Sequence, residues 1–407
     1  MFVNFIETNN VLHENQYGFR SSRCTVHAIA ALVEDITDSF ECHKTTVGVF
    51  IDFKKAFDTV NHDILLRKIE HYGIRGVALK WIASYLSDRK QFVLYNNCQS
   101  NDKNIVCGVP QGSILGPILF LLYINDICNV SDVLRLILFA DDTNIFLSDS
   151  SVSSLCTVLN IELSKLNTWF KINKLSLNVK KTNYMFFSQR RVIPDCNIVI
   201  DQANISRVYC TKFLGVLIDD KLSWKSHVAL VNSKLCKSLS VFYKVGKILD
   251  KSSLFLLYYA LIFPYLMYCS EVWGLAYKST TNCLTVTQNK FVRVISHASK
   301  RSVLLPIYRG LNILPFDNIV KLKVCYFMYK VAKHAVPSSI QNRFNLFVEP
   351  KRNYRVFMVK YCRSAAKSRS LSVYGPKLFN SLPNDVKCSH SLFHYKRQVK
   401  KFLLCTL

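Results

Sequence analysis

Apolar positions along the first 220 residues predict a mixed unit of strands and helices. An unbroken apolar run from Val47 to Ile51 is typical of a buried strand, and Asp52 follows it directly. Further strands are expected over 91–95, 184–187 and 213–218, and helices over 62–72, 76–86 and 114–124. Residues 1 to about 45 combine helical patterning with a polar, basic turn at 17–23.

A second polar break lies between the apolar runs 136–140 and 145–147, where Asp141 and Asp142 stand together. Two short apolar runs around a polar pair are typical of a β-hairpin. Apolar residues then recur at steps of three or four over 155–170, as expected for an amphipathic helix. Because the second half of the chain is mainly helical in pattern, the predicted fold class is α+β with a helical C-terminal region.

One long uncharged stretch, 252–270, has to be weighed as a membrane span. Its 19 residues approach the ~20 that a helix needs to cross a bilayer. Pro264 lies within it, four tyrosines interrupt it, and Glu271 ends it. Length alone does not separate a span from a buried helix. The pattern therefore favours two core helices, or one helix kinked at Pro264, over a membrane anchor.

Charge narrows the class of partner. The 407 residues carry 53 Lys and Arg against 27 Asp and Glu, a net charge of +26, which favours nucleic acid or an anionic membrane surface. Residues 351–407 hold 13 of the basic residues against a single acid, Asp385. Within them, 392–403 predicts a basic amphipathic helix that could contact RNA, pack on the body of the protein or lie on a membrane; nucleic acid fits best.

The cysteine pattern indicates a reducing compartment. The 15 cysteines are scattered singly and form no CxxC pair, so we expect free thiols. Cys388, His390 and His394 offer only three ligands, which does not favour a structural zinc site. Residues 1–7 lack the pattern of a secretory signal. We therefore expect an intracellular protein, in the nucleus or cytoplasm, that is not secreted.

Three aspartates in apolar surroundings carry the strongest chemical signal. Asp52 ends one apolar run, and Asp141 and Asp142 stand at the tip of another. Burying a carboxylate is costly unless it is paired or bound to a metal. Hard oxygen ligands suit Mg²⁺, and two such ions can stabilise the attacking and leaving oxygens of a phosphoryl transfer. The alternative is structural, with Asp141-Asp142 as a turn and Asp52 as a helix cap.

Ordered sequence blocks decide between these interpretations. The chain closely resembles the reverse transcriptase of a non-LTR (LINE-type) retrotransposon of the jockey-like group. The blocks are QYGFR (16–20), FIDFKKAFDTV (50–60), GVPQGSILGPILF (108–120), FADDT (139–143), LNVKKT (177–182) and KFLGVLID (212–219). Similarity to the segment after the polymerase follows at 261–274, 288–295 and 379–386. Six blocks in this order are very specific.

The resemblance implies metal and nucleotide ligands. Asp52, Asp141 and Asp142 would bind two Mg²⁺ ions, with Mn²⁺ as the alternative metal. The residues expected at the nucleotide are Arg20 on the triphosphate, Phe53 through its carbonyl, Phe57 against the sugar C2′, and Gln111 with Gly112 along the pocket. The ring of Phe57 would exclude a 2′-hydroxyl, so the incoming nucleotide would be a dNTP.

Two further sites follow from the same resemblance. Lys181 matches the lysine that assists the pyrophosphate leaving group, with its neighbour Lys180 as the alternative. Phe213, Leu214 and Gly215 resemble the hairpin that supports the primer end. For Arg20 and Lys181, a solvated surface cation is the competing interpretation.

The implied fold is a right-hand polymerase. Its expected parts are partial fingers (1–45), the palm with the remaining fingers elements (46–220), a helical thumb and post-polymerase region (221–345), and a basic C-terminal region (346–407). The reverse transcriptase domain would span about 10–220. The implied activity is RNA-directed DNA polymerisation, with an RNA template, a DNA primer and dNTPs as partners and no membrane.

The chain also departs from the family pattern. Complete elements carry an apurinic-type endonuclease before the polymerase, and a fingers segment normally precedes the QYGFR block; neither fits before Gln16. We therefore expect an N-terminally (5′-) truncated copy or a partial gene model. The rival hypothesis is a catalytically silent remnant that only binds nucleic acid.

Overall fold

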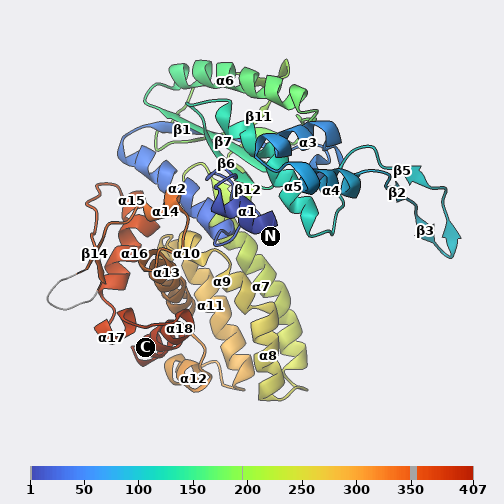
Figure 1. The fold of residues 1–407 in the computed structure, drawn as a ribbon. Coiled ribbons are helices and arrows are strands. Elements are labelled where there is room, and N and C mark those ends of the chain that lie inside the picture. Colours follow the sequence, from blue (N-terminus) through green and yellow to red (C-terminus); the bar gives the residue numbers. More distant parts are fainter. Residues whose placement is uncertain (1, 195, 349–354, 407) are drawn as a thin grey trace. The chain divides into compact units, whose positions relative to one another are not determined.

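The computed structural model describes residues 2–194, 196–348 and 355–406, and Figure 1 shows its fold. Two units can be distinguished by their internal contacts. The first comprises residues 1–24, 44–186 and 190–208, and the second comprises residues 25–43, 187–189 and 209–407. Residues 25–43, which the sequence places with the fingers, thus belong with the C-terminal helices.

A five-stranded sheet organises the first unit. Its strands are β1 (Thr45–Ile51), β6 (Arg135–Phe139), β7 (Asp142–Asp149), β8 (Asn183–Phe187) and β11 (Ser206–Arg207), in the order β11-β8-β1-β7-β6. β7 pairs antiparallel with both β1 and β6. All seven residues of β1 are buried, which accounts for the unbroken apolar run in the sequence.

Helices cover the sheet and complete the apolar core of the first unit. They are α1 (Phe2–Thr8), α3 (His62–His71), α4 (Gly76–Leu86), α5 (Leu115–Ile124) and α6 (Val152–Ile172). α6 contributes Leu155, Leu159, Leu163 and Phe170 to the core beside Val49 of β1, as its spacing predicts. Short strands add β9 (Val199–Ile200) with β10 (Ala203–Asn204), and a hairpin arm made of β2 (Lys90–Gln91), β3 (Leu94–Tyr95), β4 (Cys98–Gln99) and β5 (Lys103–Asn104) (Figure 1).

The second unit is mainly helical. Its longer helices are α2 (Thr25–Glu41), α7 (Lys225–Val245), α8 (Lys251–Leu261), α11 (Lys278–Ile295), α13 (Phe316–Ala332), α16 (Leu371–Asn380) and α18 (Leu392–Cys405). Shorter elements are α9 (Phe263–Met267), α10 (Ser270–Trp273), α12 (Leu304–Gly310), α14 (Ser338–Gln341), α15 (Ala365–Ser368) and α17 (Asn384–Lys387), with the hairpins β12 (Cys210–Phe213)–β13 (Val216–Asp219) and β14 (Leu346–Val348)–β15 (Arg355–Phe357). α13 is the buried centre, contacted by α16, α18 and α10.

The predicted α+β class with a helical C-terminal region is confirmed. The helix predicted over 76–86 has these bounds, and the aspartate pair lies at the β6–β7 hairpin. The single strand predicted over 213–218 is wrong, because a turn at Leu214 and Gly215 divides it between β12 and β13. The strand expected over 91–95 is likewise split, between β2 and β3.

The uncharged stretch 252–270 forms two core helices, as preferred from its sequence. α8 ends at Leu261, and α9 begins at Phe263 with Pro264 in its first turn, where proline is tolerated. Leu254, Tyr258 and Leu266 are fully buried. Among the described residues, no helix combines the length and apolarity that crossing a bilayer requires.

The expectation that every cysteine is a free thiol is wrong for one pair. Cys156 on α6 and Cys196, in the loop before β9, form a disulfide. Both residues pack with the apolar core of the first unit, where a cysteine behaves as a small hydrophobic residue. The pairing joins positions 40 residues apart, and such a link cannot be read from spacing alone.

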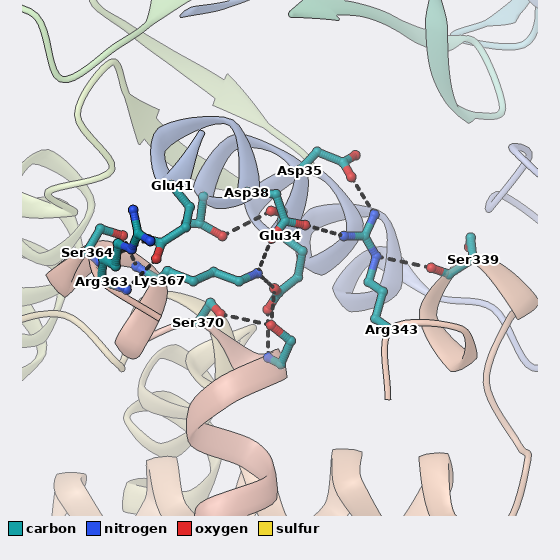
Figure 2. Close-up of polar contacts among 12 residues, drawn as sticks. Glu34, Asp35, Asp38, Glu41, Ser339, Arg343, Arg363, Ser364, Lys367 and Ser370 are labelled. Atoms are coloured by element: carbon teal, nitrogen blue, oxygen red, sulfur yellow. Dashed lines mark hydrogen bonds and ion pairs between the residues drawn. The ribbon is translucent and has the colours of Figure 1, made fainter. Parts of the chain in front are cut away.

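An ion-pair network fixes the C-terminal segment on α2 (Figure 2). Lys367 of α15 lies 2.7 Å from a carboxylate oxygen of the buried Glu34 and 2.6 Å from one of Asp38. Ser372 donates to Glu34 through both its backbone N–H (2.8 Å) and its hydroxyl (2.6 Å). Arg343 pairs with Asp35 and Asp38 of the same helix.

Burial and ion pairing have opposite effects on the ionisation of Glu34 and Lys367. Burial opposes the charge on Glu34, yet the positive charge of Lys367 and the donated hydrogen bonds hold the pKa of Glu34 below its usual value. Burial likewise opposes the charge on Lys367, and Glu34 and Asp38 nevertheless raise the pKa of Lys367. The pair is therefore ionised inside the protein, where it depends on both partners being present.

We predict that Glu34→Gln lowers the free energy of unfolding of the second unit by about 3–5 kcal/mol, because Lys367 is left buried without its buried carboxylate partner. The double variant Glu34→Gln/Lys367→Met should recover much of this loss. Urea unfolding followed by circular dichroism measures it, with Lys360→Met at an exposed position as the control. Equal stability of Glu34→Gln and the control variant would contradict the prediction.

Candidate active site

Strand register brings the three predicted aspartates to one end of the sheet. Ile51, the last residue of β1, pairs with Thr143 of β7, and Asp52 follows at this end of the sheet, near enough for its charge to act on Asp142. Phe139 pairs with Asp142 across the β6–β7 hairpin, which leaves Ala140 and Asp141 as its two turn residues. Asp52, Asp141 and Asp142 therefore lie together, although 89 residues of sequence separate the first two.

The turn that carries Asp141 is supported from beneath by the QYGFR block. Ala140 has a φ of 55°, an unusual conformation for a residue other than glycine. The buried side-chain oxygen of Gln16 accepts hydrogen bonds from the N–H groups of Ala140 (3.0 Å) and Gly18 (2.8 Å). Tyr17 also donates its N–H to the carbonyl of Leu138 on β6. These contacts give Gln16 and Gly18 a role in shaping the β6–β7 turn that the sequence does not predict.

Asp52 is oriented by the LNVKKT block. The Asn178 side-chain amide donates to an Asp52 carboxylate oxygen at 2.9 Å. The Asp52 N–H donates to the Thr182 hydroxyl at 3.3 Å, and the Asn178 N–H donates to the Asp52 carbonyl at 2.8 Å. The sequence identified this block but not Asn178. Its amide is a neutral donor that orients Asp52 without cancelling its negative charge.

A hollow of about 550 Å³ opens beside Asp52. Its wall includes Asn178, Lys181, Phe53 and Lys55. Of the two lysines that the sequence left as alternatives, Lys181 is the one in this wall. Phe53 forms an antiparallel bridge with Leu177. The hydrogen bonds of this bridge are made by neighbouring residues: the Lys54 N–H donates to the Ser176 carbonyl, and the Asp52 carbonyl accepts the Asn178 N–H.

The surroundings of Asp141 and Asp142 oppose the ionisation of these two carboxyl groups. Partial burial raises the pKa of Asp142, and the negative charges of Asp141 and Asp52 raise it further. Partial burial and the charge of Asp52 also raise the pKa of Asp141, against a backbone hydrogen bond that lowers it. Like charges held together in this way favour binding of a cation.

Within the described ranges, no three Asp, Glu, His or Cys side chains converge closely enough to hold a metal ion by themselves. The donor set nevertheless suits Mg²⁺, which usually binds one or two carboxylates and completes its shell with water and substrate phosphates. Asp52, Asp141 and Asp142 are therefore chemically suited to divalent cations whose remaining ligands come from a nucleotide.

The GVPQG loop lies against the segment that contains Phe57. Val109 donates its N–H to the Phe57 carbonyl at 2.9 Å, and the Gln111 amide donates to Asp58 at 2.7 Å. The Phe57 ring stacks on Phe120 with centroids 4.4 Å apart, which fixes its orientation. Gln111 lines a second hollow of about 590 Å³, which shares Lys55 in its wall with the hollow beside Asp52. Gly112 follows Gln111 as an exposed residue of the loop with a φ of 80°.

Arg20 has internal partners in this structure. Its side chain is 6% exposed and pairs with Glu7 at 2.8 Å. Its guanidinium also donates to the carbonyls of Leu12 and His13. These bonds connect the QYGFR block to α1. A triphosphate contact would require Arg20 to leave these partners, so that role stays a prediction from the resemblance.

The predicted primer-supporting residues form a tight turn within the second unit. Leu214 and Gly215 both have positive φ values, 45° and 84°, between the paired residues Phe213 and Val216. Two positive φ values are required in a type I′ hairpin turn, which favours glycine. The Tyr268 hydroxyl donates to the Leu214 carbonyl at 2.6 Å. Tyr268 thus holds this turn, a contact that sequence spacing does not reveal.

We predict that Gly18→Ala distorts the β6–β7 turn, because a Cβ at Gly18 would lie 2.5 Å from the backbone nitrogen of Ala140. Relieving this clash should cost about 1–3 kcal/mol of stability and move Asp141. Gly310→Ala is the matched control, since a Cβ there would meet nothing within 4 Å. Thermal unfolding measures the effect, and indistinguishable midpoints for the two variants would contradict it.

We predict that Asp142→Asn raises the midpoint of thermal unfolding at pH 7 without divalent metal. The raised pKa of Asp142 means that its ionised form destabilises the folded state. This penalty is present above the folded-state pKa and disappears below the unfolded value of about 3.9. The advantage of the variant should therefore vanish as the pH falls below about 4.

Mg²⁺ should reverse the order at pH 7, because it stabilises the wild type more than Asp142→Asn. Asp102→Asn, at an exposed position of the hairpin arm, is the control. A wild type whose midpoint is indifferent to Mg²⁺ would count against a metal site at the aspartates.

The chain is similar in sequence to known proteins. Residues 1–218 match the family described as reverse transcriptase (RNA-dependent DNA polymerase). The chain is 28% identical over 333 residues to a probable RNA-directed DNA polymerase from transposon X-element of Drosophila melanogaster, covering 78% of this chain and 36% of that relative. It is 27% identical over 303 residues to the RNA-directed DNA polymerase from mobile element jockey of Drosophila funebris, covering 72% and 33%.

Among solved structures, a telomerase from Candida tropicalis in complex with a TWJ fragment of telomeric RNA has a TM-score of 0.41 and 12% identity, covering 99% of this chain and 55% of that chain. The chain spans about a third of the length of the two retrotransposon relatives. The family match covers more than half of the chain and contains all three aspartates. The chain belongs to the reverse transcriptase family.

Proposed function

We propose that this protein is an RNA-directed DNA polymerase of a non-LTR retrotransposon. A primer 3′-hydroxyl attacks the α-phosphate of a dNTP paired to an RNA template, and pyrophosphate leaves. The observation that carries the proposal is the gathering of Asp52, Asp141 and Asp142 at one sheet end, within the matched domain. Clustered carboxylates that oppose each other's ionisation suit a reaction with several negative phosphate oxygens and divalent cations.

Each residue around the aspartates has a proposed part. Asp52 is held by Asn178, so its carboxylate keeps one orientation as the nucleotide enters. Lys181, in the wall of the same hollow, would donate a proton to the leaving pyrophosphate or stabilise its negative charge. Lys55 borders both hollows and adds a second cation near the path of the phosphates. When bound, two divalent cations would neutralise charge on the attacking and leaving oxygens.

Sugar selection is assigned to Phe57. Its ring is held against Phe120, so it cannot swing away to admit a larger sugar without losing that stacking. Gln111 and Gly112 would line the nucleotide, and the Phe53 carbonyl would add a backbone oxygen. Phe213, Leu214 and Gly215 would support the primer, with Tyr268 fixing their turn.

We predict that the protein extends a DNA primer on an RNA template with dNTPs and Mg²⁺, and that Asp141→Asn lowers the rate at least a hundredfold, about the scale of removing one charged group from an active site. Phe57→Val should raise ribonucleotide incorporation relative to dNTPs without abolishing extension. Lys360→Met, at an exposed position, is the control for general charge. A wild type that binds template and primer but extends nothing would support the catalytically silent remnant instead.

A further inference from the structure

The second unit contains a pocket of its own. It has a volume of about 560 Å³, within the range of ligand sites. Its walls come from α2, the turn that follows β13, the start of α11, and the segment from Ser364 to Leu371. All of its lining residues belong to the second unit, whereas the three aspartates belong to the first. The pocket is therefore a site separate from the proposed polymerase centre.

The pocket is cationic. Lys221, Lys225 and Arg369 lie in its walls, and Glu34 is the acid among its lining residues. The charge of Glu34 is already used by Lys367 and the donors of Ser372 (Figure 2). Lys221 is partly engaged, since its ammonium donates to the Ser188 carbonyl at 2.5 Å. Within the described part of the chain, no carboxylate lies within ion-pair distance of Lys225 or Arg369, so an anionic ligand would complete the pocket.

Arg369 and Tyr277 form a stacked pair at the pocket. The guanidinium carbon of Arg369 lies 3.4 Å from the centre of the Tyr277 ring, and that tyrosine is 54% exposed. A guanidinium stacked on a ring still presents its N–H groups at its edge, where they can grip a phosphate in bidentate fashion. Aromatic rings and guanidinium planes are also the surfaces on which unpaired RNA bases stack.

Hydroxyl groups complete the lining. Ser223, Ser279, Thr280 and Ser364 all lie in the walls. A hydroxyl can both donate and accept, as a ribose 2′-hydroxyl does. A wall with cations, hydroxyls and one stacked aromatic pair matches the parts of a ribonucleotide: phosphate, sugar and base.

The walls are fixed before any ligand arrives. On one side, Lys367 fastens α15 to Glu34 and Asp38, and the Glu41 carboxylate accepts the backbone N–H of Ser364 at 2.9 Å (Figure 2). A pocket of this kind loses little conformational entropy when it binds.

The turn that follows β13, residues 221–224, forms another part of the wall and is strained. The Asp219 carboxylate accepts the backbone N–H groups of Ser223 and Trp224 at 2.8 Å each, and that of Lys221 at 3.2 Å. Leu222 and Trp224 are held at positive φ values of 51° and 63°. Strained backbone of this kind collects at ligand-binding sites because the surrounding contacts enforce it.

We propose that this pocket is a second RNA-binding site, which captures one unpaired nucleotide of a folded RNA. The base stacks on the Tyr277–Arg369 pair, and the flanking phosphate binds Arg369 and Lys225. The site would hold a structured part of an RNA independently of the strand being copied. It adds a partner-recognition function to the proposed polymerase activity but does not require that activity, because it can be measured by binding alone.

Fluorescence anisotropy tests the proposal with two labelled RNAs, a stem with an unpaired loop and the same stem closed as a blunt duplex. Tyr277→Ala and Arg369→Ala should each weaken binding of the loop RNA about tenfold, the scale of one stacked base, and change duplex binding less than twofold. Tyr277→Phe should retain the affinity. Arg369→Ala should also reduce the salt dependence by about one phosphate contact, whereas Tyr277→Ala should not.

Matched controls separate this site from general charge and from misfolding. Tyr361→Ala removes a tyrosine that is 89% exposed and outside the pocket lining, and Lys360→Ala removes one exposed charge. Photo-crosslinking of wild-type protein to loop RNA containing 4-thiouridine should label the peptide around Tyr277, a result that does not depend on any variant folding.

Several outcomes would overturn the proposal: equal losses on loop and duplex RNA, wild-type affinity in both pocket variants, or crosslinks only to other peptides. If the pocket variants lose affinity for poly-glutamate but not for RNA, the ligand of the pocket is an acidic protein instead. Primer extension on a short unstructured template should be unaffected by Tyr277→Ala. If wild-type protein does not extend primers but binds loop RNA through Tyr277, the polymerase proposal fails and this one stands.

Discussion

Repulsion among carboxylates is the constraint that the first unit is built to withstand. The β1–β7 register places Asp52 near Asp142, and the β6–β7 turn adds Asp141. A slip by one residue would relieve the repulsion, but it would also move every side chain of β1 to the opposite face of the sheet and disrupt its packing. Burial of Val47, Val49 and Ile51 therefore enforces the clustering. The polar bonds of Gln16 and Asn178 fix the orientation without supplying positive charge, so the cluster stays ready for cations.

Sequence reasoning recovered what depends on local pattern. The buried strand β1, the helix over 76–86 and the aspartate hairpin follow from apolar spacing, and the family follows from ordered blocks. The supporting contacts were out of reach because they join distant residues: Gln16 reaches Ala140 across 124 positions, and Asn178 reaches Asp52 across 126. Arg20 shows the converse, since its motif suggests a triphosphate ligand while its nearest acid is Glu7. Residue type and spacing do not specify which partner a cation finds in three dimensions.

The sequence did not predict the grouping of α2 with the C-terminal helices, because this grouping too depends on contacts between distant residues. The helical patterning over residues 1 to about 45 predicts a helix but not the surface that the helix covers. The acids Glu34, Asp35 and Asp38 on it resemble a solvated face in sequence, yet they hold Lys367 and Arg343. Part of the positive charge of the C-terminal region is thus neutralised by acidic side chains within the fold. The net charge of +26 indicates a polyanionic partner, but it overstates how many cations are available to bind one.

The cations of the chain fall into three groups, according to whether their charge is balanced by protein carboxylates, by water or by neither. Lys367 has its counter-charges in the protein and needs no ligand. Other cations, such as Arg397 and Lys401 of α18, are exposed to water, which solvates them cheaply. Arg369 belongs to neither group, because it is partly buried in a pocket with fixed walls and lacks a carboxylate partner among the described residues. The three aspartates are the same case with the opposite sign. In both places the protein keeps like charges in a preorganised setting, and a ligand of opposite charge is what such a setting is able to bind.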